Sequence, residues 1–211
     1  SADENLVDAF IRGADFHAST AARVFGVPVE EVTPQMRSRA KAVNFGIVYG
    51  QQAYGLATSL KISRGEAQDM IDRDFAAYPG VRTFLDESIA LARERKYAVT
   101  MYGRKRRIRD IDSSNLQLRS FAERTAMNHP MQGTAADIIK IAMVRVESRL
   151  REEGLRSKLV LQIHDELDLE VPEDEVPAVS KLVEEAMEGV IELRVPLTAE
   201  VSCGSNWAEA K

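Results

Sequence analysis

Four side chains spaced four residues apart constrain this chain more than any other feature of its sequence. Arg37, Lys41, Phe45 and Tyr49 lie in the segment RSRAKAVNFGIVYG, residues 37 to 50. In an α-helix, residues at this spacing lie on one face, so the pattern predicts a helix with two cations followed by two aromatic rings. The row is about 18 Å long at 1.5 Å per residue. Because cations bind phosphates and aromatic rings stack on bases, the row has the length and chemical order of a nucleoside triphosphate.

The same segment has a second interpretation. Its apolar residues match the buried side of an ordinary amphipathic helix: Ala40, Val43, Phe45, Ile47 and Val48. In that interpretation Arg37 and Lys41 form only the hydrated end of the helix. Two cations four residues apart repel each other mildly, which favours a polyanion between them. Both interpretations stay open on this segment alone.

Composition is that of a soluble globular protein. Of 211 residues, 45% are hydrophobic and 29% are charged, which is enough apolar material for one large domain or two small ones. The net charge of −5 argues against a simple basic nucleic-acid binder. Cys203 is the only cysteine, so an internal disulfide is excluded. With no stretch long enough to span a membrane and no signal-peptide pattern, we expect no membrane partner and an intracellular protein, either cytoplasmic and nucleoid-associated in a bacterium or phage-encoded.

The charges are unevenly distributed along the chain. Residues 91 to 109 carry one acid, Glu94, and eight cations: Arg93, Arg95, Lys96, Arg104, Lys105, Arg106, Arg107 and Arg109. Residues 165 to 200 carry twelve acids against Lys181 and Arg194. A basic strip can hold a phosphate backbone, and an acidic pocket can hold a divalent metal. We interpret most of the acidic segment as solvated surface.

Local signals in the first half predict a succession of helices. Thr33-Pro34 is typical of a helix start, and Gly50 with Gly55 predicts a bend after that helix. Ser63 with Glu66 matches a capping box, so a further helix is expected to run to about Ala77. Another long helix is expected over 81 to 95.

The second half mixes strands with helices. Two strands are expected over 97 to 101 and 106 to 108, and a helical pattern over 116 to 151 should be interrupted at Pro130. Apolar and alternating residues over 159 to 172 predict a hairpin with His-Asp-Glu at its tip. The other expected elements are a helix over 174 to 190 and a last strand over Leu197–Val201. The fold class is therefore α+β, mostly helical with a small antiparallel sheet.

The hairpin tip His164-Asp165-Glu166 is a candidate metal site. A carboxylate fixed at a tight turn and open to solvent suits Mg²⁺, which takes one or two carboxylates and completes its shell with water and phosphate. Adjacent residues on an extended chain point in opposite directions, so Asp165 and Glu166 should not bind the ion in the same way. An ordinary polar turn explains these three residues equally well when they are considered alone.

A third group lies in AERTAMNHPMQGTAADIIK, residues 122 to 140. Arg124, Asn128 and Gln132 are again spaced by four. One cation and two neutral amides on a shared face can contact the minor groove, where both base-pair types present acceptors. A buried amide pair joining two helices is the alternative, and both stay open. His17 follows Asp15-Phe16 at a helix start and could either touch a phosphate or serve in capping and packing.

Together these segments resemble the family A DNA polymerases, which are the polymerases of the DNA polymerase I type. The segment 37 to 50 looks like motif B of that family, LQIHDE like motif C, and 122 to 140 like the long palm helix between them. DENLVDAF near the start, YPGV at 78 to 81 and GSNW at 204 to 207 are also similar. The resemblance implies fingers in residues 1–110, with the basic hairpin at their end. It implies part of the palm, with the motif C hairpin, in residues 111–211.

The resemblance implies a role for each residue of the row. Arg37 and Lys41 would grip the triphosphate of the incoming dNTP, and Lys41 would also protonate the leaving pyrophosphate. Phe45 would pack against the sugar and base, while Tyr49 would occupy the templating side of the insertion site. His17 matches a family histidine near the triphosphate.

The remaining roles implied by the resemblance concern DNA and metal. Arg124 and Gln132 would touch the minor groove of the primer-template, with Asn128 nearby, and His164 would lie near the primer end. Asp165, with Glu166 beside it, would bind two Mg²⁺ ions for phosphoryl transfer from dNTP to the primer 3′-hydroxyl. These are the roles of a DNA-directed DNA polymerase in replication or repair.

The family's motif A, which carries the second metal-binding carboxylate, does not occur in these 211 residues. We therefore expect that the chain alone does not polymerise DNA, and that a second chain with motif A and the thumb is a possible partner. A non-catalytic nucleotide- or DNA-binding fragment is the alternative function. An unrelated metal-dependent phosphoesterase and a purely structural helical protein are two further alternatives.

Overall fold

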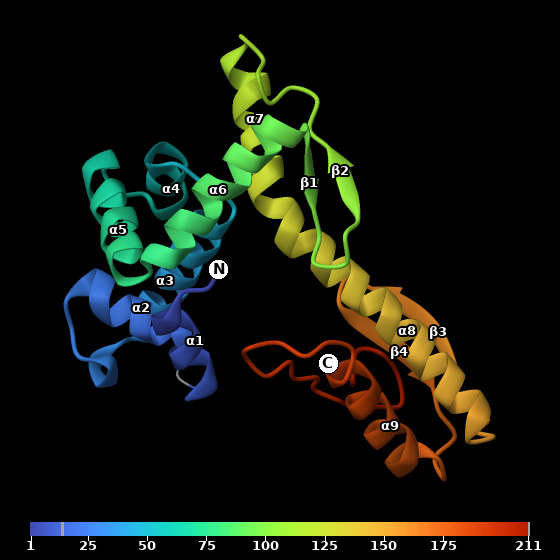
Figure 1. Ribbon diagram of the computed structural model, residues 1–211. Helices are drawn as coiled ribbons and strands as arrows, with labels where there is room; N and C mark the ends of the chain where they lie inside the picture. Colours follow the sequence, from blue (N-terminus) through green and yellow to red (C-terminus); the bar gives the residue numbers. More distant parts are fainter. Residues whose placement is uncertain (14, 211) are drawn as a thin grey trace. The chain divides into compact units, whose positions relative to one another are not determined.

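The structure is a computed structural model and describes residues 1–13 and 15–210. It contains helices and two antiparallel hairpins, which confirms the α+β class (Figure 1). The chain divides into two compact units, Ser1–Met131 and Gln132–Lys211. No helix among the described residues is long and apolar enough to cross a membrane. The predicted boundary between fingers and palm at residue 110 separates functional parts of the chain, and it stays a prediction.

The first unit is mostly helical. Its helices are α1 (Glu4–Ile11), α2 (Phe16–Phe25), the 3₁₀ turn η1 (Val29–Glu31), α3 (Pro34–Val48), α4 (Ala53–Leu60), α5 (Arg64–Ala77), α6 (Pro79–Arg95) and α7 (Leu116–Asn128). Between α6 and α7 the strands β1 (Tyr97–Val99) and β2 (Lys105–Arg107) form an antiparallel hairpin. Gly103 lies in its turn with a φ of 81°, a conformation that glycine adopts without steric cost.

Two helix starts follow the sequence signals. Thr33 caps α3, because its hydroxyl accepts a hydrogen bond of 3.2 Å from the Met36 amide, and Pro34 occupies the first turn. Ser63 and Glu66 form the expected capping box at the start of α5, with reciprocal bonds of 3.1 and 2.9 Å. Because α3 begins at Pro34, Arg37, Lys41 and Phe45 all lie within one helix.

The core of the first unit decides how α3 is oriented. Val43 and Ile47 are buried in a cluster shared with α4 and α5, as the amphipathic interpretation predicts. Phe45 and Tyr49, however, are 44% and 41% exposed. The assignment of Phe45 to the buried side was therefore wrong. The helix buries one face and presents the row of cations and rings on another, so the two interpretations describe opposite faces of one helix.

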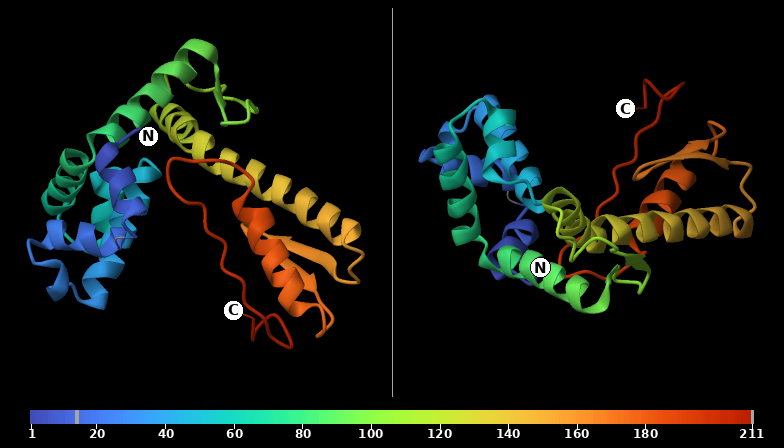
Figure 2. Two further views of the ribbon diagram at one scale, coloured as in Figure 1. Left: turned by 60° about the horizontal axis from the view of Figure 1, so that its bottom comes forward. Right: turned by 90° about the horizontal axis from the view of Figure 1, so that it is seen from above.

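A π-helical turn, η2 (His129–Gly133), follows α7 and contains Pro130, which confirms the predicted interruption. The second unit then consists of α8 (Thr134–Glu152), the hairpin of β3 (Lys158–Ile163) and β4 (Glu166–Glu170), and α9 (Val176–Glu188) (Figure 2). Helix α9 packs against α8, and a core between them includes Val146, Leu150 and Leu182. The apolar side of β4 packs on this core, as the alternation of its residues predicts.

A buried carboxylate fixes the start of the second unit's hairpin. Glu175 accepts hydrogen bonds from the Ser157 hydroxyl at 2.6 Å, the Ser157 amide at 3.0 Å, and the amide and Nε of Arg156 at 3.0 and 2.9 Å. These donors, the Ser157 hydroxyl first, lower the pKa of Glu175 to about 2. Because the carboxylate satisfies two backbone amides, it holds the chain immediately before β3.

Two local predictions were wrong. Leu197–Val201 forms no strand, because a strand needs a ladder partner; the Ala199 amide donates instead to Glu188 Oε1 at 3.0 Å. Gly55 lies inside α4 rather than in a bend. Of Gly50 and Gly55, only Gly50 has a positive φ, 69°. The strand β3 forms as expected, and its apolar residues Val160 and Leu161 are each 51% exposed.

Candidate functional site

The outward face of α3 carries the predicted row. The rings of Phe45 and Tyr49 stack, with centroids 6.2 Å apart and planes 12° from parallel. Lys41 Nζ lies 5.8 Å from the Phe45 ring centroid, which is within reach of a cation–π contact. Tyr49 is the residue that ends the helix. The sequence spacing therefore produces a continuous surface that changes from cationic to aromatic.

His17 joins this row from α2. Its ring centroid is 5.8 Å from that of Phe45, and its Nδ1 is 3.0 Å from Nδ2 of the buried Asn44 on α3. With the Asn44 amide as donor, the proton of the neutral imidazole lies on Nε2. Burial, followed by the charge of Arg37, lowers the pKa of His17 below its ordinary value. The ring is thus a neutral hydrogen-bond donor beside two cations at neutral pH.

Asp15 also contacts the row, and sequence reasoning did not assign it a role. Its Oδ2 accepts a hydrogen bond of 2.6 Å from Arg37 Nε, and its Oδ1 accepts one of 2.9 Å from the Ala18 amide. The bond from Arg37, followed by that from Ala18, lowers the pKa of the Asp15 carboxyl. A cap residue for α2 was visible in the sequence, but its contact with a residue 22 positions away was not.

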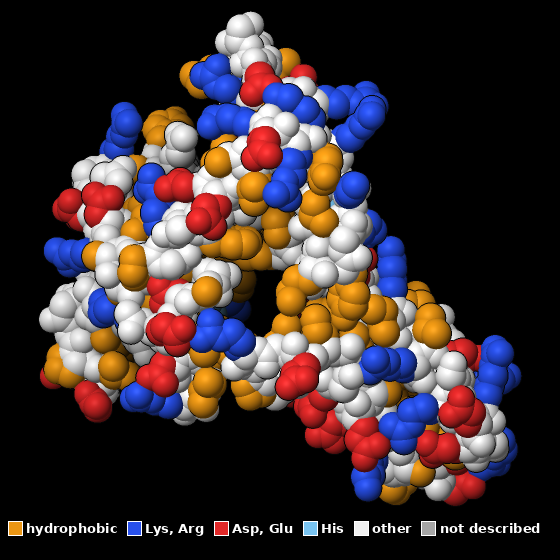
Figure 3. Space-filling model, in the orientation of Figure 1, with side chains coloured by type: hydrophobic (Ala, Val, Ile, Leu, Met, Phe, Trp, Pro, Cys, Tyr) orange, Lys and Arg blue, Asp and Glu red, His pale blue; other side chains and the backbone are white. Residues whose placement is uncertain are grey.

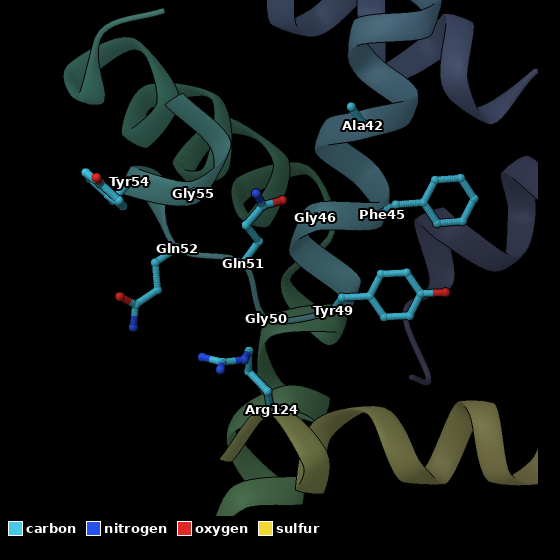
Figure 4. Close-up of a pocket in the computed structure, with 10 residues that line it drawn as sticks. All are labelled: Ala42, Phe45, Gly46, Tyr49, Gly50, Gln51, Gln52, Tyr54, Gly55 and Arg124. Carbon is cyan, nitrogen blue, oxygen red and sulfur yellow. The ribbon is translucent and has the colours of Figure 1, made fainter. Parts of the chain in front are cut away.

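A shallow pocket of about 480 Å³ lies behind the aromatic end of the row. It is lined by Ala42, Phe45, Gly46, Tyr49, Gly50, Gln51, Gln52, Tyr54, Gly55 and Arg124. Figure 4 shows the Phe45 and Tyr49 rings pointing the same way from α3, while Tyr54 and Gln52 border the far side and Arg124 comes from α7. On the side away from these two rings, Tyr54 with the nearby amides and the Arg124 guanidinium forms a surface that suits a nucleobase.

Gly50 shapes this pocket and gives a test of its packing. It has a φ of 69°, and a Cβ there would lie 2.2 Å from Met127 Cε on α7. We expect Gly50→Ala to lower the melting temperature by about 4–8 °C, from the left-handed backbone penalty together with displacement of Met127. Differential scanning calorimetry measures the change.

Gly26 provides the matched control for that substitution. It has the same φ of 69° but nothing within 4 Å of its Cβ position. Gly26→Ala should therefore cost only the backbone term, about 2–4 °C. Equal losses in the two variants would contradict the role of Gly50 in admitting Met127.

The structure brings Arg124 to this pocket, and the other two members of its predicted group do not line it. Arg124 Nη1 donates to Ser120 Oγ at 2.8 Å, and its side chain lies on the pocket wall. Asn128, at the end of the same helix, has a buried Oδ1 with no hydrogen-bond partner among the described residues. Gln132 lies in η2, is exposed, and belongs to the second unit.

The hairpin β1–β2 is the basic strip of the first unit. Its second strand consists of Lys105, Arg106 and Arg107, all exposed, and Lys105 Nζ lies 4.8 Å from the Tyr97 ring centroid. Figure 3 shows Lys and Arg side chains along this hairpin. Arg93 and Lys96 are less available because they pair with Glu123 and Asp112. An extended positive surface of this kind suits a phosphate backbone.

The tip of β3–β4 places the three predicted polar residues together. Ile163 pairs with Glu166, so His164 and Asp165 form a two-residue turn. His164 has a φ of 55°, a conformation that costs a non-glycine residue about 1–2 kcal/mol. Asp165 is exposed, whereas Glu166 Oε1 accepts a hydrogen bond of 2.7 Å from Trp207 Nε1. The two adjacent carboxylates therefore have different surroundings.

Comparison with known proteins identifies the family. The model of "DNA polymerase family A" matches residues 1–209. The chain belongs to DNA polymerase family A. It is 51% identical over its whole length to DNA polymerase I of Caldicellulosiruptor bescii and 51% identical over 209 residues to that of Geobacillus stearothermophilus. It spans 25% and 24% of the length of these relatives, about a quarter of each.

A solved structure has the same fold. It is the POL domain of Pol1 from M. smegmatis in complex with DNA primer-template and dNTP. The match has a TM-score of 0.94 at 46% sequence identity and covers 99% of this chain and 37% of that chain. The resemblance to family A, which rested on the row, the hairpin tip and the helix between them, is confirmed.

Proposed function

We propose that this chain provides the nucleotide-binding surface and one metal-binding carboxylate of a DNA-directed DNA polymerase. The observation that carries the proposal is the exposed row on α3, in which two cations precede two stacked rings, in a chain of family A. Under this proposal residues 1–110 act as fingers and residues 111–211 as part of the palm.

The row would hold dNTP lengthwise. The cationic side chains of Arg37 and Lys41 would neutralise the triphosphate, while Phe45 would pack against the sugar and base. Tyr49, stacked on Phe45, would border the position of the templating base, next to the pocket. The neutral His17 can donate Nε2–H to a phosphate oxygen without adding charge.

Primer-template DNA would lie on groups outside the row. The exposed cations of β2 suit the phosphate backbone. Arg124 and Gln132 would contact the minor groove, where hydrogen bonds test pair shape rather than sequence, and Asn128 would support them. The unpartnered Oδ1 of Asn128 can accept a hydrogen bond only if a donor reaches it. His164 would lie near the primer end.

The hairpin tip fits a divalent metal in part. Asp165 is an exposed carboxylate on a rigid turn, and Glu166 stands beside it with one oxygen held by Trp207. No group of three or more His, Cys, Asp or Glu in the described residues could hold a metal alone. Members of the family depend on divalent metal, and Mg²⁺ takes few carboxylates. We infer that Asp165, assisted by Glu166, holds Mg²⁺ jointly with nucleotide phosphates, water and a carboxylate from motif A.

The reaction is nucleotidyl transfer. The primer 3′-hydroxyl releases its proton to solvent water and its oxygen forms a bond to the α-phosphorus of dNTP, while the bond from that phosphorus to the pyrophosphate oxygen breaks. Two bound Mg²⁺ ions would activate the 3′-hydroxyl and stabilise the leaving group's charge. Arg37 and Lys41 would orient the triphosphate, and Lys41 would transfer a proton to the departing pyrophosphate.

Titration of the 211-residue chain with dATP and Mg²⁺, followed by NMR, tests the proposal. We expect saturable shifts of the Lys41, Phe45 and Tyr49 resonances, and none with sodium chloride at the same ionic strength. Replacing Mg²⁺ by paramagnetic Mn²⁺ should broaden the signals of Asp165, because that carboxylate is the proposed ligand of the metal. Shifts confined to residues away from the row would contradict the proposal.

A second candidate is nucleotide and DNA binding without catalysis. It is favoured by the observation that the described residues contain no complete metal-ligand cluster. Both functions predict the same dATP shifts. Primer extension separates them, since only a catalytic role makes extension depend on Asp165.

A further inference from the structure

The carboxylate of Asp15 links the start of α2 to the cationic end of the row. Its two oxygens have different partners: Oδ1 accepts from the Ala18 amide at 2.9 Å, and Oδ2 accepts from Arg37 Nε at 2.6 Å. The first bond caps α2 and holds the carboxylate in place. The second bond therefore ties Arg37 to a group that is itself fixed to the backbone.

The bond uses only one edge of the Arg37 guanidinium. Within residues 1–13 and 15–210, the contact with Asp15 is the one ion pair of this side chain, and it is made through Nε. The two terminal nitrogens carry four N–H donors that Asp15 does not use. The Arg37 side chain is 48% exposed, so these donors face a surface that a ligand can reach.

We propose that Asp15 is a positioning residue that holds Arg37 so that its terminal nitrogens receive the triphosphate. A long arginine side chain loses rotamer freedom when it binds a phosphate, and a side chain already restrained loses less. The restraint also fixes the plane of the guanidinium, which bidentate contact with a phosphate requires. This inference rests on the proposed nucleotide site.

The Asp15 carboxylate also has an opposite effect on triphosphate binding, because a negative charge near the site repels an anion. Two features make positioning the larger effect. Asp15 is bonded to Nε rather than to the terminal nitrogens, so a phosphate does not have to displace it. The paired charge of Arg37 also screens the carboxylate from a ligand on the far edge of the guanidinium.

Asp15→Asn separates positioning from capping. Asparagine is as good an N-cap as aspartate, so its one carbonyl oxygen can remain with the Ala18 amide. Its amide nitrogen is a donor and cannot accept the Arg37 Nε–H. Asp15→Ser likewise keeps a cap oxygen without charge and must give the same result. Asp86→Asn is the matched control, since it breaks an exposed carboxylate–arginine pair of 2.8 Å, with Arg82 on α6.

The experiment measures dissociation constants of the full chain by NMR for two probes, inorganic tripolyphosphate and deoxyadenosine. Asp15→Asn should weaken tripolyphosphate binding by about threefold to tenfold, the range expected for loss of a charge-assisted restraint. It should leave deoxyadenosine binding and the melting temperature unchanged, and Asp86→Asn should change neither constant. In an Arg37→Ala background, Asp15→Asn should have no further effect on tripolyphosphate.

Two results overturn the inference. Unchanged or tighter tripolyphosphate binding by both Asp15 variants means that the carboxylate does not position Arg37. An equal loss in the Arg37→Ala background means that Asp15 acts on some other group. Both results differ from failure of the nucleotide site itself. In that case the wild-type chain binds neither probe and Arg37→Ala changes nothing. That outcome overturns this inference as well.

Discussion

Replacing Asp165 by asparagine should lower the rate of primer extension by about 10³-fold. A catalytic metal stabilises the transition state by several kcal/mol, and each 1.4 kcal/mol corresponds to about a factor of ten. Asparagine keeps the size and turn preference of aspartate but lacks the charge that a hard cation requires. Since Asp165 is exposed in a two-residue turn, its replacement should leave the fold intact.

The measurement requires a complete polymerase. A suitable one is a chimera in which this sequence replaces the matching 24% of Geobacillus stearothermophilus DNA polymerase I. Single-nucleotide incorporation with saturating dNTP and Mg²⁺ gives kcat for the parent chimera and its variants. Binding of primer-template, measured in parallel, should not change in Asp165→Asn.

Glu166→Gln is the internal comparison. Glu166 already gives one oxygen to the Trp207 indole, and glutamine can keep that bond through its carbonyl oxygen. We therefore expect a loss of no more than about tenfold, consistent with an assisting role beside the metal. If Glu166→Gln costs as much as Asp165→Asn, the two carboxylates act equally and the distinction drawn from their surroundings is wrong.

The parts of the fold that could be predicted from the sequence are those determined by neighbouring residues. Thr33-Pro34 and the Ser63–Glu66 box marked the starts of α3 and α5, since a cap requires only three or four adjacent residues. Pro130 marked the interruption at η2 for the same reason. The spacing of Lys41 and Phe45 placed them on one face because the helical repeat alone determines it.

The parts that the sequence could not supply depend on residues far apart in the chain. The contact of Asp15 with Arg37 and that of His17 with Asn44 arise because α2 packs against α3, which no local pattern encodes. The strand expected at Leu197–Val201 failed for a related reason, since strand propensity is realised only where a ladder partner exists.

The same difference between local patterns and long-range contacts applies to the candidate site. Its individual residues were identified from motifs, but their environments were not. The sequence did not show that Phe45 is exposed or that Trp207 donates to Glu166. It also left Gly50 and Gly55 equivalent, whereas only Gly50 adopts a left-handed conformation and faces Met127. Motif spacing identifies the chemistry, and tertiary packing determines which side chains can use it.

Replacing Lys41 by alanine should have the second large effect, a fall in kcat of about 10²- to 10⁴-fold. That is the range contributed by a positioned general acid. Lys41 is exposed on α3 with its ammonium near the Phe45 ring, so it can move to a phosphate without leaving a buried charge behind. The same chimera and the same single-nucleotide assay measure the effect. Lys181→Ala, on the surface of α9, is the control and should leave kcat unchanged.

Lys41→Arg separates the two roles assigned to this side chain. Arginine keeps the positive charge but does not give up its proton at physiological pH. If Lys41 both binds the triphosphate and protonates pyrophosphate, the arginine variant should keep KM for dNTP within about threefold while kcat stays low. Full recovery of kcat in Lys41→Arg would show that charge alone is needed and that the proton comes from another group. A low kcat with normal KM assigns the proton to Lys41, because only transition-state stabilisation is then lost.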